Sequence, residues 1–223
     1  MKKANAAEEQ GAETLQTAVW KGGFGREYTD RNTFDPETLE NLYRKNYGVS
    51  RSELNREFLA DIAQDASLLE VGCNTGNQLM MLRQMGWTNL SGVELQPYAA
   101  EILRGRLPDV AVELGSALAL PHPALAFDVV FTSGVLIHIS PQDLPRALDE
   151  IYRVSKKYIW GLEYYAAEAT EVKYRNHSGL LWKTDFARGY LERFPDLELV
   201  KERRLPYLDS ENVDTVFLLR RRR

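Results

Sequence analysis

The stretch Leu68-Leu69-Glu70-Val71-Gly72-Cys73-Asn74-Thr75-Gly76-Asn77 decides how this chain folds. A short apolar run ends at one glycine, and a second glycine precedes a segment with helical spacing over 78–84. A glycine-rich turn between a strand and a helix brings backbone N–H groups close to a ligand. The stretch therefore predicts a strand–turn–helix unit whose turn contacts a ligand.

Apolar runs recur on the carboxyl side of this unit, separated by segments with helical spacing. Helices are expected to begin at Pro97 and near Ser140-Pro141. Such alternation predicts an α/β fold with a mostly parallel seven-stranded sheet and helices on both faces. Ligands in such sheets bind where the strands end, at the switch in strand order. The further expected strands are 90–95, 110–114, 127–132, 157–162, 197–200 and 213–219.

The amino-terminal part differs in composition. Residues 1–18 are expected to form a flexible tail, and the glycine- and aromatic-rich stretch 20–32 an ordered loop or short lid. Asp35-Pro36 and the Ser50–Glu53 capping box predict two helix starts. We expect one domain over 19–223, divided into a lid with helices (19–66), a cofactor-binding core (67–165) and a substrate loop with terminal strands (166–223).

Composition narrows the class of protein. The chain has 223 residues, 44% of them hydrophobic, and a formal net charge of −4. These values are typical of a globular domain and argue against a general nucleic-acid binder, which is usually basic. No apolar run of about 18 residues predicts a membrane span, and Cys73 is the single cysteine. A cytoplasmic protein without a metal site is expected, and the oligomeric state is not readable from the sequence.

The turn after the first strand fits one ligand template better than another. A dinucleotide turn would need glycine at 72, 74 and 77, but Asn occupies the last two positions. The pattern acidic-x-Gly-x-x-x-Gly of Glu70 to Gly76 fits the first motif of class I methyltransferases that use S-adenosylmethionine (SAM). Asn74 tolerates the left-handed backbone that such a turn requires. Without a ligand, the same pattern would be a plain glycine-rich turn.

Polar residues follow the other strands. Glu94 can accept hydrogen bonds from both hydroxyls of a ribose, or act as a favourable charge before the next helix. Ser116 could contact an adenine amine or be a simple turn residue. His138 and Glu163 are the candidate bases, and a buried structural histidine is the other interpretation of His138. Tyr164 and Tyr165 are either substrate contacts or half-buried aromatic residues. The Asn/Asp-Pro-Pro-aromatic signature of base-amine methylation is absent.

Residues 50–160 resemble the class I SAM-dependent methyltransferases, through Glu70 to Gly76, Glu94 and the run 127–132. Nearly the whole chain past residue 18 resembles the pseudaminic acid biosynthesis-associated methylases, through residues 24–32, 134–139, 163–165 and 172–177. The resemblance implies a Rossmann-like fold, SAM as cofactor and a role near nonulosonic acid sugars. The expected cofactor contacts are Glu70, Gly72, Cys73, Asn74, Gly76, Glu94, Leu95, Ser116, Ala117, Ser133 and Gly134. The expected substrate contacts are Tyr28, Arg31, Tyr164, Tyr165, Tyr174, Arg175 and His177.

The sequence therefore predicts methyl transfer from SAM to an oxygen or nitrogen of a small polar, acidic metabolite, such as a nonulosonic acid sugar or its precursor. His138 or Glu163 would remove a proton from a hydroxyl nucleophile, whereas a free amine needs no base. Three alternatives stay open: another natural-product acceptor, a macromolecular acceptor, and a non-catalytic SAM-binding protein.

Overall fold

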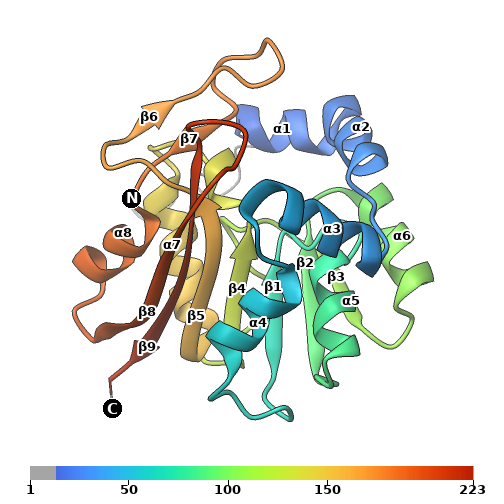
Figure 1. The fold of residues 1–223 in the computed structure, drawn as a ribbon, viewed down its shortest axis with the longest axis vertical. Helices are drawn as coiled ribbons and strands as arrows, with labels where there is room; N and C mark the ends of the chain where they lie inside the picture. Colours follow the sequence, from blue (N-terminus) through green and yellow to red (C-terminus); the bar gives the residue numbers. More distant parts are fainter. Residues whose placement is uncertain (1–13, 223) are drawn as a thin grey trace, which may run out of the picture.

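The computed structural model describes residues 14–222, in which strands and helices alternate through the core (Figure 1). The strands are β1 (Leu68–Val71), β2 (Leu90–Glu94), β3 (Ala111–Leu114), β4 (Phe127–Ser133), β5 (Ser155–Tyr164), β6 (Thr170–Glu171), β7 (Trp182–Lys183), β8 (Leu197–Pro206) and β9 (Val213–Arg221). The helices are α1 (Leu15–Lys21), α2 (Gly23–Arg31), α3 (Pro36–Tyr47), α4 (Arg51–Leu59), α5 (Asn77–Gln84), α6 (Pro97–Arg106), the 3₁₀ turn η1 (Leu136–His138), α7 (Leu144–Val154) and α8 (Phe186–Arg193).

The main sheet has seven strands in the order β3-β2-β1-β4-β5-β9-β8. The pairs from β3 to β5 are parallel, and β9 is antiparallel to both β5 and β8. This confirms the mostly parallel seven-stranded sheet expected from the sequence. Since β1 lies between β2 and β4, the strand order switches there, and the turn after β1 lies at the position where open α/β sheets bind ligands.

Helices cover both faces of the sheet, each with its own apolar cluster. Strand residues alternate between the two, so Leu68 belongs to one cluster and Leu69 to the other. Residues of α4, α5 and α6 fill the first cluster, and residues of α7 and α8 fill the second. The predicted helix starts at Asp35-Pro36, Ser50 and Pro97 are confirmed, since Asp35 caps α3, Ser50 forms a capping box with Glu53 and α6 begins at Pro97. Helix α7 begins at Leu144, later than the start expected near Ser140-Pro141.

The glycine-rich stretch 20–32 was expected to form an ordered loop or short lid. The expectation of a loop is wrong, because most of the stretch belongs to the two short helices α1 and α2. A Cβ atom on Gly25 would lie 1.8 Å from the backbone oxygen of Trp20. The glycine therefore allows α1 and α2 to pack backbone to backbone, and it does not signal an irregular chain. Of the expected tail, residues 15–18 belong to α1, and residues 1–13 lie outside the described residues.

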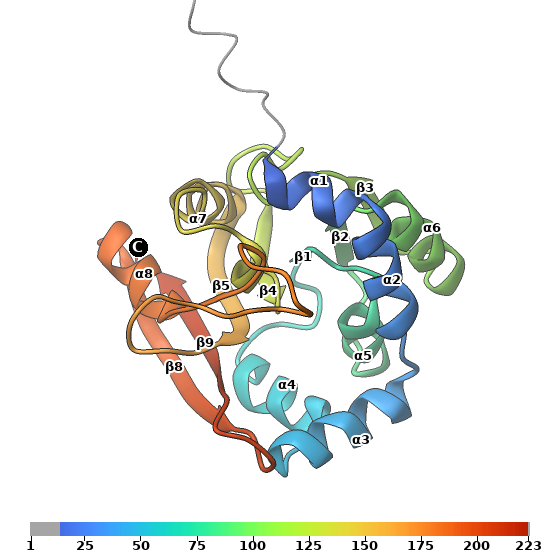
Figure 2. The ribbon, with the colours of Figure 1, turned by 90° about the horizontal axis from the view of Figure 1, so that it is seen from above.

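Two other elements also differ from expectation. Helix α8 was not expected, and β8 extends to Pro206, well past the expected residue 200. Figure 2 shows α1, α2 and α3 arranged in an arc beside β1, β2 and β4. Within residues 14–222, no helix has the length and apolar character needed to cross a membrane.

Gly161 provides a test of the packing between β5 and β9. A Cβ atom there would lie 2.2 Å from the ring of Phe217, so Gly161→Ala should destabilise the fold by about 1–3 kcal/mol through overpacking. The measurement is urea unfolding. Gly105→Ala is the control, because no atom lies within 4 Å of its added Cβ and it sits in α6. Equal stability of the two variants would contradict the packing described here.

Candidate active site

The turn after β1 has the left-handed backbone that its glycines suggested. Gly72, Asn74 and Gly76 have φ values of 73°, 45° and 78°. A Cβ atom on Gly72 would lie 2.6 Å from the Val135 side chain. Asn74 occupies the left-handed region as predicted, and Asn is among the non-glycine residues that visit this region most readily.

Glu94, at the end of β2, fixes this turn. Its side chain is buried, and its two oxygens accept hydrogen bonds from the backbone N–H of Asn74 at 2.7 Å and of Gln96 at 2.8 Å. Burial raises the pKa of Glu94, and the backbone hydrogen bonds oppose that rise. Each carboxylate oxygen has a second lone pair, so the group can still accept hydrogen bonds from a ligand in the cavity that it lines.

Two buried polar groups beside the turn have atoms without partners. Among residues 14–222, neither Glu70 Oε2 nor Arg51 Nη2 has a hydrogen-bond partner, although both side chains line the cavity. Arg51 is otherwise held, because its Nε donates to Gln78 and its Nη1 to the Tyr43 hydroxyl, both at 2.7 Å. Burial raises the pKa of Glu70 to about 8, with Arg51 opposing the rise. An unpaired acceptor and an unpaired donor here suit a ligand group with both functions.

Side-chain hydrogen bonds hold helices α1 and α2 over the cavity. Thr29 donates to the Asn74 side chain at 3.1 Å, and the Gln96 amide donates to the backbone oxygen of Lys21 at 2.8 Å. Tyr98 donates to Asp30 at 2.7 Å. These bonds connect the helices with the turn after β1 and the start of α6, so the arrangement acts as a closed lid.

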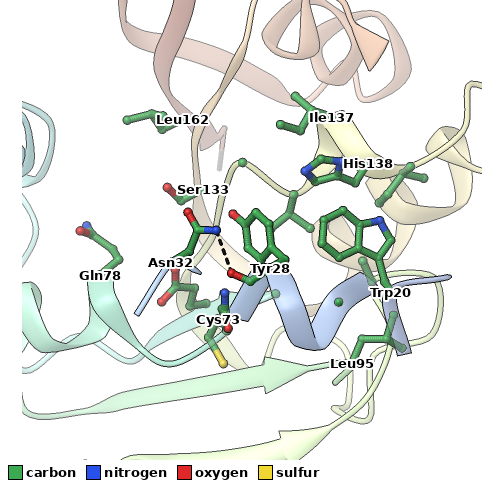
Figure 3. Close-up of a pocket in the computed structure, with 18 of the residues that line it drawn as sticks. Trp20, Tyr28, Asn32, Cys73, Gln78, Leu95, Ser133, Ile137, His138 and Leu162 are labelled. Atoms are coloured by element: carbon green, nitrogen blue, oxygen red, sulfur yellow. Dashed lines mark hydrogen bonds between the residues drawn. The ribbon is translucent and has the colours of Figure 1, made fainter. Parts of the chain in front are cut away.

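His138 lies under the lid among aromatic rings. Figure 3 shows it grouped with Trp20 and Tyr28 at one side of the pocket, and its ring centroid is 4.4 Å from that of Trp20. Its Nδ1 is 2.8 Å from the Leu180 carbonyl oxygen, so Nδ1–H donates and Nε2 is left as an acceptor. Burial lowers the pKa of His138 to about 4, which keeps the ring neutral near pH 7.

Glu163, the other expected base, does not line the cavity. Its carboxylate accepts hydrogen bonds from the backbone N–H of Val135 at 3.1 Å and of Ile137 at 3.4 Å. Burial raises its pKa to about 7. We therefore correct the expected role of Glu163: it holds the backbone of η1, the turn that carries His138, and is a positioning residue.

The other expected site residues divide into two groups. Gly76 does not border the cavity; it precedes α5 and packs on Leu103. The expected site residues that do line the cavity are Glu70, Gly72, Cys73, Asn74, Glu94, Leu95, Ser116, Ala117, Ser133, Gly134, Tyr28, Tyr164, Tyr174 and His138.

Four expected substrate contacts lie outside the cavity lining. Arg31 pairs with Glu27 on the same helix, and the Arg204 guanidinium lies 3.4 Å from the Tyr165 ring centroid. Arg175 is exposed, and His177 packs against Phe24. The expectation that these four side chains touch a ligand in this cavity is therefore corrected.

Several cavity residues were not predicted from the sequence. They come from α3, α4 and the β8–β9 hairpin, far from the motif strands, and no local pattern marked them. The signals available in the sequence were Arg51, directly after the Ser50 helix cap, and Tyr43 and Tyr47, which are one helical turn apart. These residues are Tyr43, Tyr47, Arg51, Tyr207 and Asp214.

The cavity has a volume of about 420 Å³ and opens at the carboxyl ends of β1, β2 and β4. Comparison with known proteins shows what the surrounding segment is similar to. Residues 68–158 match the family described as methyltransferase domain. A methyltransferase-like protein of Schizosaccharomyces pombe is 26% identical over 132 residues, and the match spans 58% of this chain and half the length of that relative.

Solved structures show the same fold. The 1,6-didemethyltoxoflavin-N1-methyltransferase of Burkholderia thailandensis, solved with its substrate and S-adenosylhomocysteine (SAH), is 18% identical with a TM-score of 0.71, and the match covers 96% of this chain and 92% of that one. The geranyl diphosphate C-methyltransferase of Streptomyces coelicolor A3(2), also with SAH, is 13% identical with a TM-score of 0.69, covering 95% and 100%. The chain thus has the Rossmann-like class I methyltransferase fold.

The left-handed turn after β1 can be tested at Asn74. Asn74→Val should weaken SAH binding about tenfold, because a left-handed conformation costs a non-glycine residue about 1–2 kcal/mol and a branched side chain more. Asn74→Gly is the matched control and should stay within about threefold of wild type, since glycine adopts this backbone without that cost. Isothermal titration with SAH gives both affinities, and wild-type affinity in the Val variant would contradict the assignment.

Proposed function

We propose that the protein is an SAM-dependent methyltransferase acting on an oxygen or nitrogen atom of a small polar metabolite. The observation that carries the proposal is the turn after β1, with Glu94 beside it and the unpaired atoms of Glu70 and Arg51 in the same cavity. The domain match over residues 68–158 and the SAH-bound neighbours support the same cofactor.

The residues present fit each part of SAM. Glu94 would hold the ribose hydroxyls, as an acid at the end of β2 does in related sheets. Glu70 Oε2 and Arg51 Nη2 would hold the amino and carboxylate groups of the methionine part, which would give both unpaired atoms a partner. Leu95, Ser116 and Ala117 line the cavity past the ends of β2 and β3, where the adenine would lie.

The closed lid supports a small acceptor. Gln16 on α1 donates to the backbone oxygen of Gly179 at 3.1 Å, and the Phe24 ring on α2 lies 5.9 Å from that of Tyr174. The lid and the loop of residues 166–185 therefore meet over the cavity, which disfavours a macromolecular acceptor. Nonulosonic acid sugars or their precursors remain the candidate acceptors suggested by the family resemblance. Since Arg31 and Arg175 lie outside the cavity, an acidic group on the acceptor rests on that resemblance alone.

The main task of the protein in methyl transfer is to position the acceptor atom relative to the methyl group. When bound, SAM supplies an electrophilic methyl group on its sulfonium. The lid excludes water, and the aromatic rings beside His138 hold the acceptor in line. His138 Nε2 can accept the proton of a hydroxyl nucleophile while Nδ1–H stays on Leu180. Glu163 keeps η1, and with it His138, in place.

The reaction can be tested by label transfer. The full chain is incubated with methyl-labelled SAM and a cell extract separated into low-mass and macromolecular fractions. Label in the low-mass fraction is expected, and its mass identifies the acceptor. Label confined to macromolecules would overturn the small-metabolite acceptor, and SAM binding without any label would favour a non-catalytic protein.

Glu94→Gln should weaken SAH binding about ten- to a hundredfold, because hydrogen bonds to a charged acceptor contribute about 1.5–3 kcal/mol. Glu101→Gln, an exposed acid on α6, is the matched control and should bind SAH like wild type. Isothermal titration gives the affinities. Unchanged binding by the Glu94 variant would remove Glu94 from the cofactor site.

His138→Gln should lower turnover about 10²–10⁴-fold if the acceptor is a hydroxyl, with SAH affinity unchanged. Because the pKa of His138 is lowered to about 4, its neutral form predominates throughout pH 6–8, and the wild-type rate should not titrate with this group there. His177→Gln, exposed and outside the cavity lining, is the control. A fully active His138 variant would exclude His138 as the base.

A further inference from the structure

One wall of the cavity consists of aromatic rings around a carboxylate. We name Tyr43, Tyr47, Tyr164, Tyr207 and Asp214 the tyrosine–aspartate subsite, and all five line the cavity. The β8–β9 turn lies beside α3 (Figure 2), where the backbone N–H of Leu208 donates to the Asn46 oxygen at 2.8 Å. These contacts bring the tyrosines of α3 next to Asp214, whose neighbour on β5 is Tyr164.

Asp214 is bound on one side only. The Tyr47 hydroxyl donates to its Oδ2 at 2.6 Å, and the Tyr207 hydroxyl lies 3.4 Å from the same atom. The side chain is 2% exposed, and Oδ1 has no hydrogen-bond partner among residues 14–222. The described residues also provide no ion pair to this carboxylate within 4 Å. A buried carboxylate oxygen without a partner is costly unless a ligand supplies a donor.

We propose that the tyrosine–aspartate subsite binds the acceptor through a protonated amine of that acceptor, with Asp214 Oδ1 as its counter-ion. The inference rests on the proposed function and names the class of its substrate. An ammonium group donates a charge-assisted hydrogen bond to a carboxylate, and aromatic faces attract it as well. The rings pack against one another beside Asp214, with centroids 5.3 Å apart for Tyr43–Tyr47 and 4.7 Å apart for Tyr47–Tyr207, so the ammonium would meet them from the cavity that they line.

The basic groups near Asp214 are already engaged. Lys183 is hydrogen-bonded to Asn212, lies 5.2 Å from the Tyr164 ring centroid and is outside the cavity lining. Arg51 is the one arginine or lysine among the described residues that line the cavity. Its Nε and Nη1 hold Gln78 and Tyr43, and its Nη2 is assigned above to the cofactor carboxylate. Both cations keep their charge and oppose the rise that burial causes in the pKa of Asp214, but neither donates to Oδ1, so this oxygen is left for an ammonium group of the acceptor.

Three sugars of equal ring size test the subsite on the SAH-saturated full chain: D-glucosamine, D-glucose and D-glucuronate. At pH 6.5, we expect glucosamine to bind at least tenfold more tightly than the other two, measured by ligand-observed NMR titration. Equal binding of glucose would reduce the subsite to a neutral hydrogen-bond acceptor, and tighter binding of glucuronate would reverse its charge preference. Both results overturn the proposal.

Asp214→Asn should remove the preference for glucosamine and leave SAH affinity within about twofold of wild type. Asp209→Asn, an exposed acid in the same β8–β9 turn, is the matched control and should keep the preference. Loss of SAH affinity in a folded Asp214 variant would assign the carboxylate to the cofactor and overturn the inference. Failure of wild-type protein to bind SAH would instead overturn the proposed function.

Wild-type protein offers a second measurement if the Asp214 variant does not fold. A crystal structure with SAH and glucosamine should place the sugar nitrogen within hydrogen-bond distance of Asp214 Oδ1. A nitrogen located elsewhere in the cavity would overturn the assignment.

Discussion

The hydrogen bonds of the Glu94 carboxylate are the interaction on which the site depends. One oxygen holds the left-handed turn after β1 through the Asn74 N–H, and the other holds the start of α6 through the Gln96 N–H. The side chains of these same two residues then bind the lid, through Thr29 and through the backbone of Lys21. A single buried acid thus connects the turn after β1, the start of α6 and the cover of the cavity, so the proposed ribose contact and the closed lid would depend on the same group.

This coupling explains why the lid consists of helices. The lid has to place Thr29 and the Lys21 carbonyl within hydrogen-bond distance of Asn74 and Gln96. Two short helices can do so, provided that their backbones approach closely, and Gly25 allows that approach. Glycine content was therefore a correct sign of a constrained segment, but it does not distinguish a loop from tight helix packing.

The sequence predicted the sheet, the turn and most cavity residues of the cofactor side, because each follows directly from a strand end. Asn74 is the clearest example, since its preference for left-handed backbone is local and survives in the structure. Arg51 and Asp214 could not be found in this way. They reach the cavity through the packing of α4 on the sheet and through the antiparallel register of β9 with β5, and neither is encoded by a nearby motif. Arg31 and Arg175 were expected to contact the substrate because they are cationic and lie in segments expected near the carboxyl ends of the strands. Neither side chain lines the cavity, so charge and position in the sequence were not sufficient for this prediction.

The charged residues of the cavity lie on two walls, one proposed to bind the cofactor and the other proposed to bind the acceptor. The wall next to the turn combines Glu70, Glu94 and Arg51, and this mixture matches a ligand that itself carries charges of both signs. The wall of α3 and the β8–β9 hairpin presents one carboxylate among tyrosine rings, a surface complementary to a cation.

Neutral His138 lies under the lid beside Trp20 and Tyr28, held by a backbone carbonyl. A nucleophilic amine attacks in its unprotonated form and needs no base for that step, so a histidine whose pKa is near 4 limits a hydroxyl nucleophile more than an amine nucleophile. The ammonium group at Asp214 has no lone pair, so it would orient the acceptor, and the methyl group would go to a different oxygen or nitrogen atom of the same molecule.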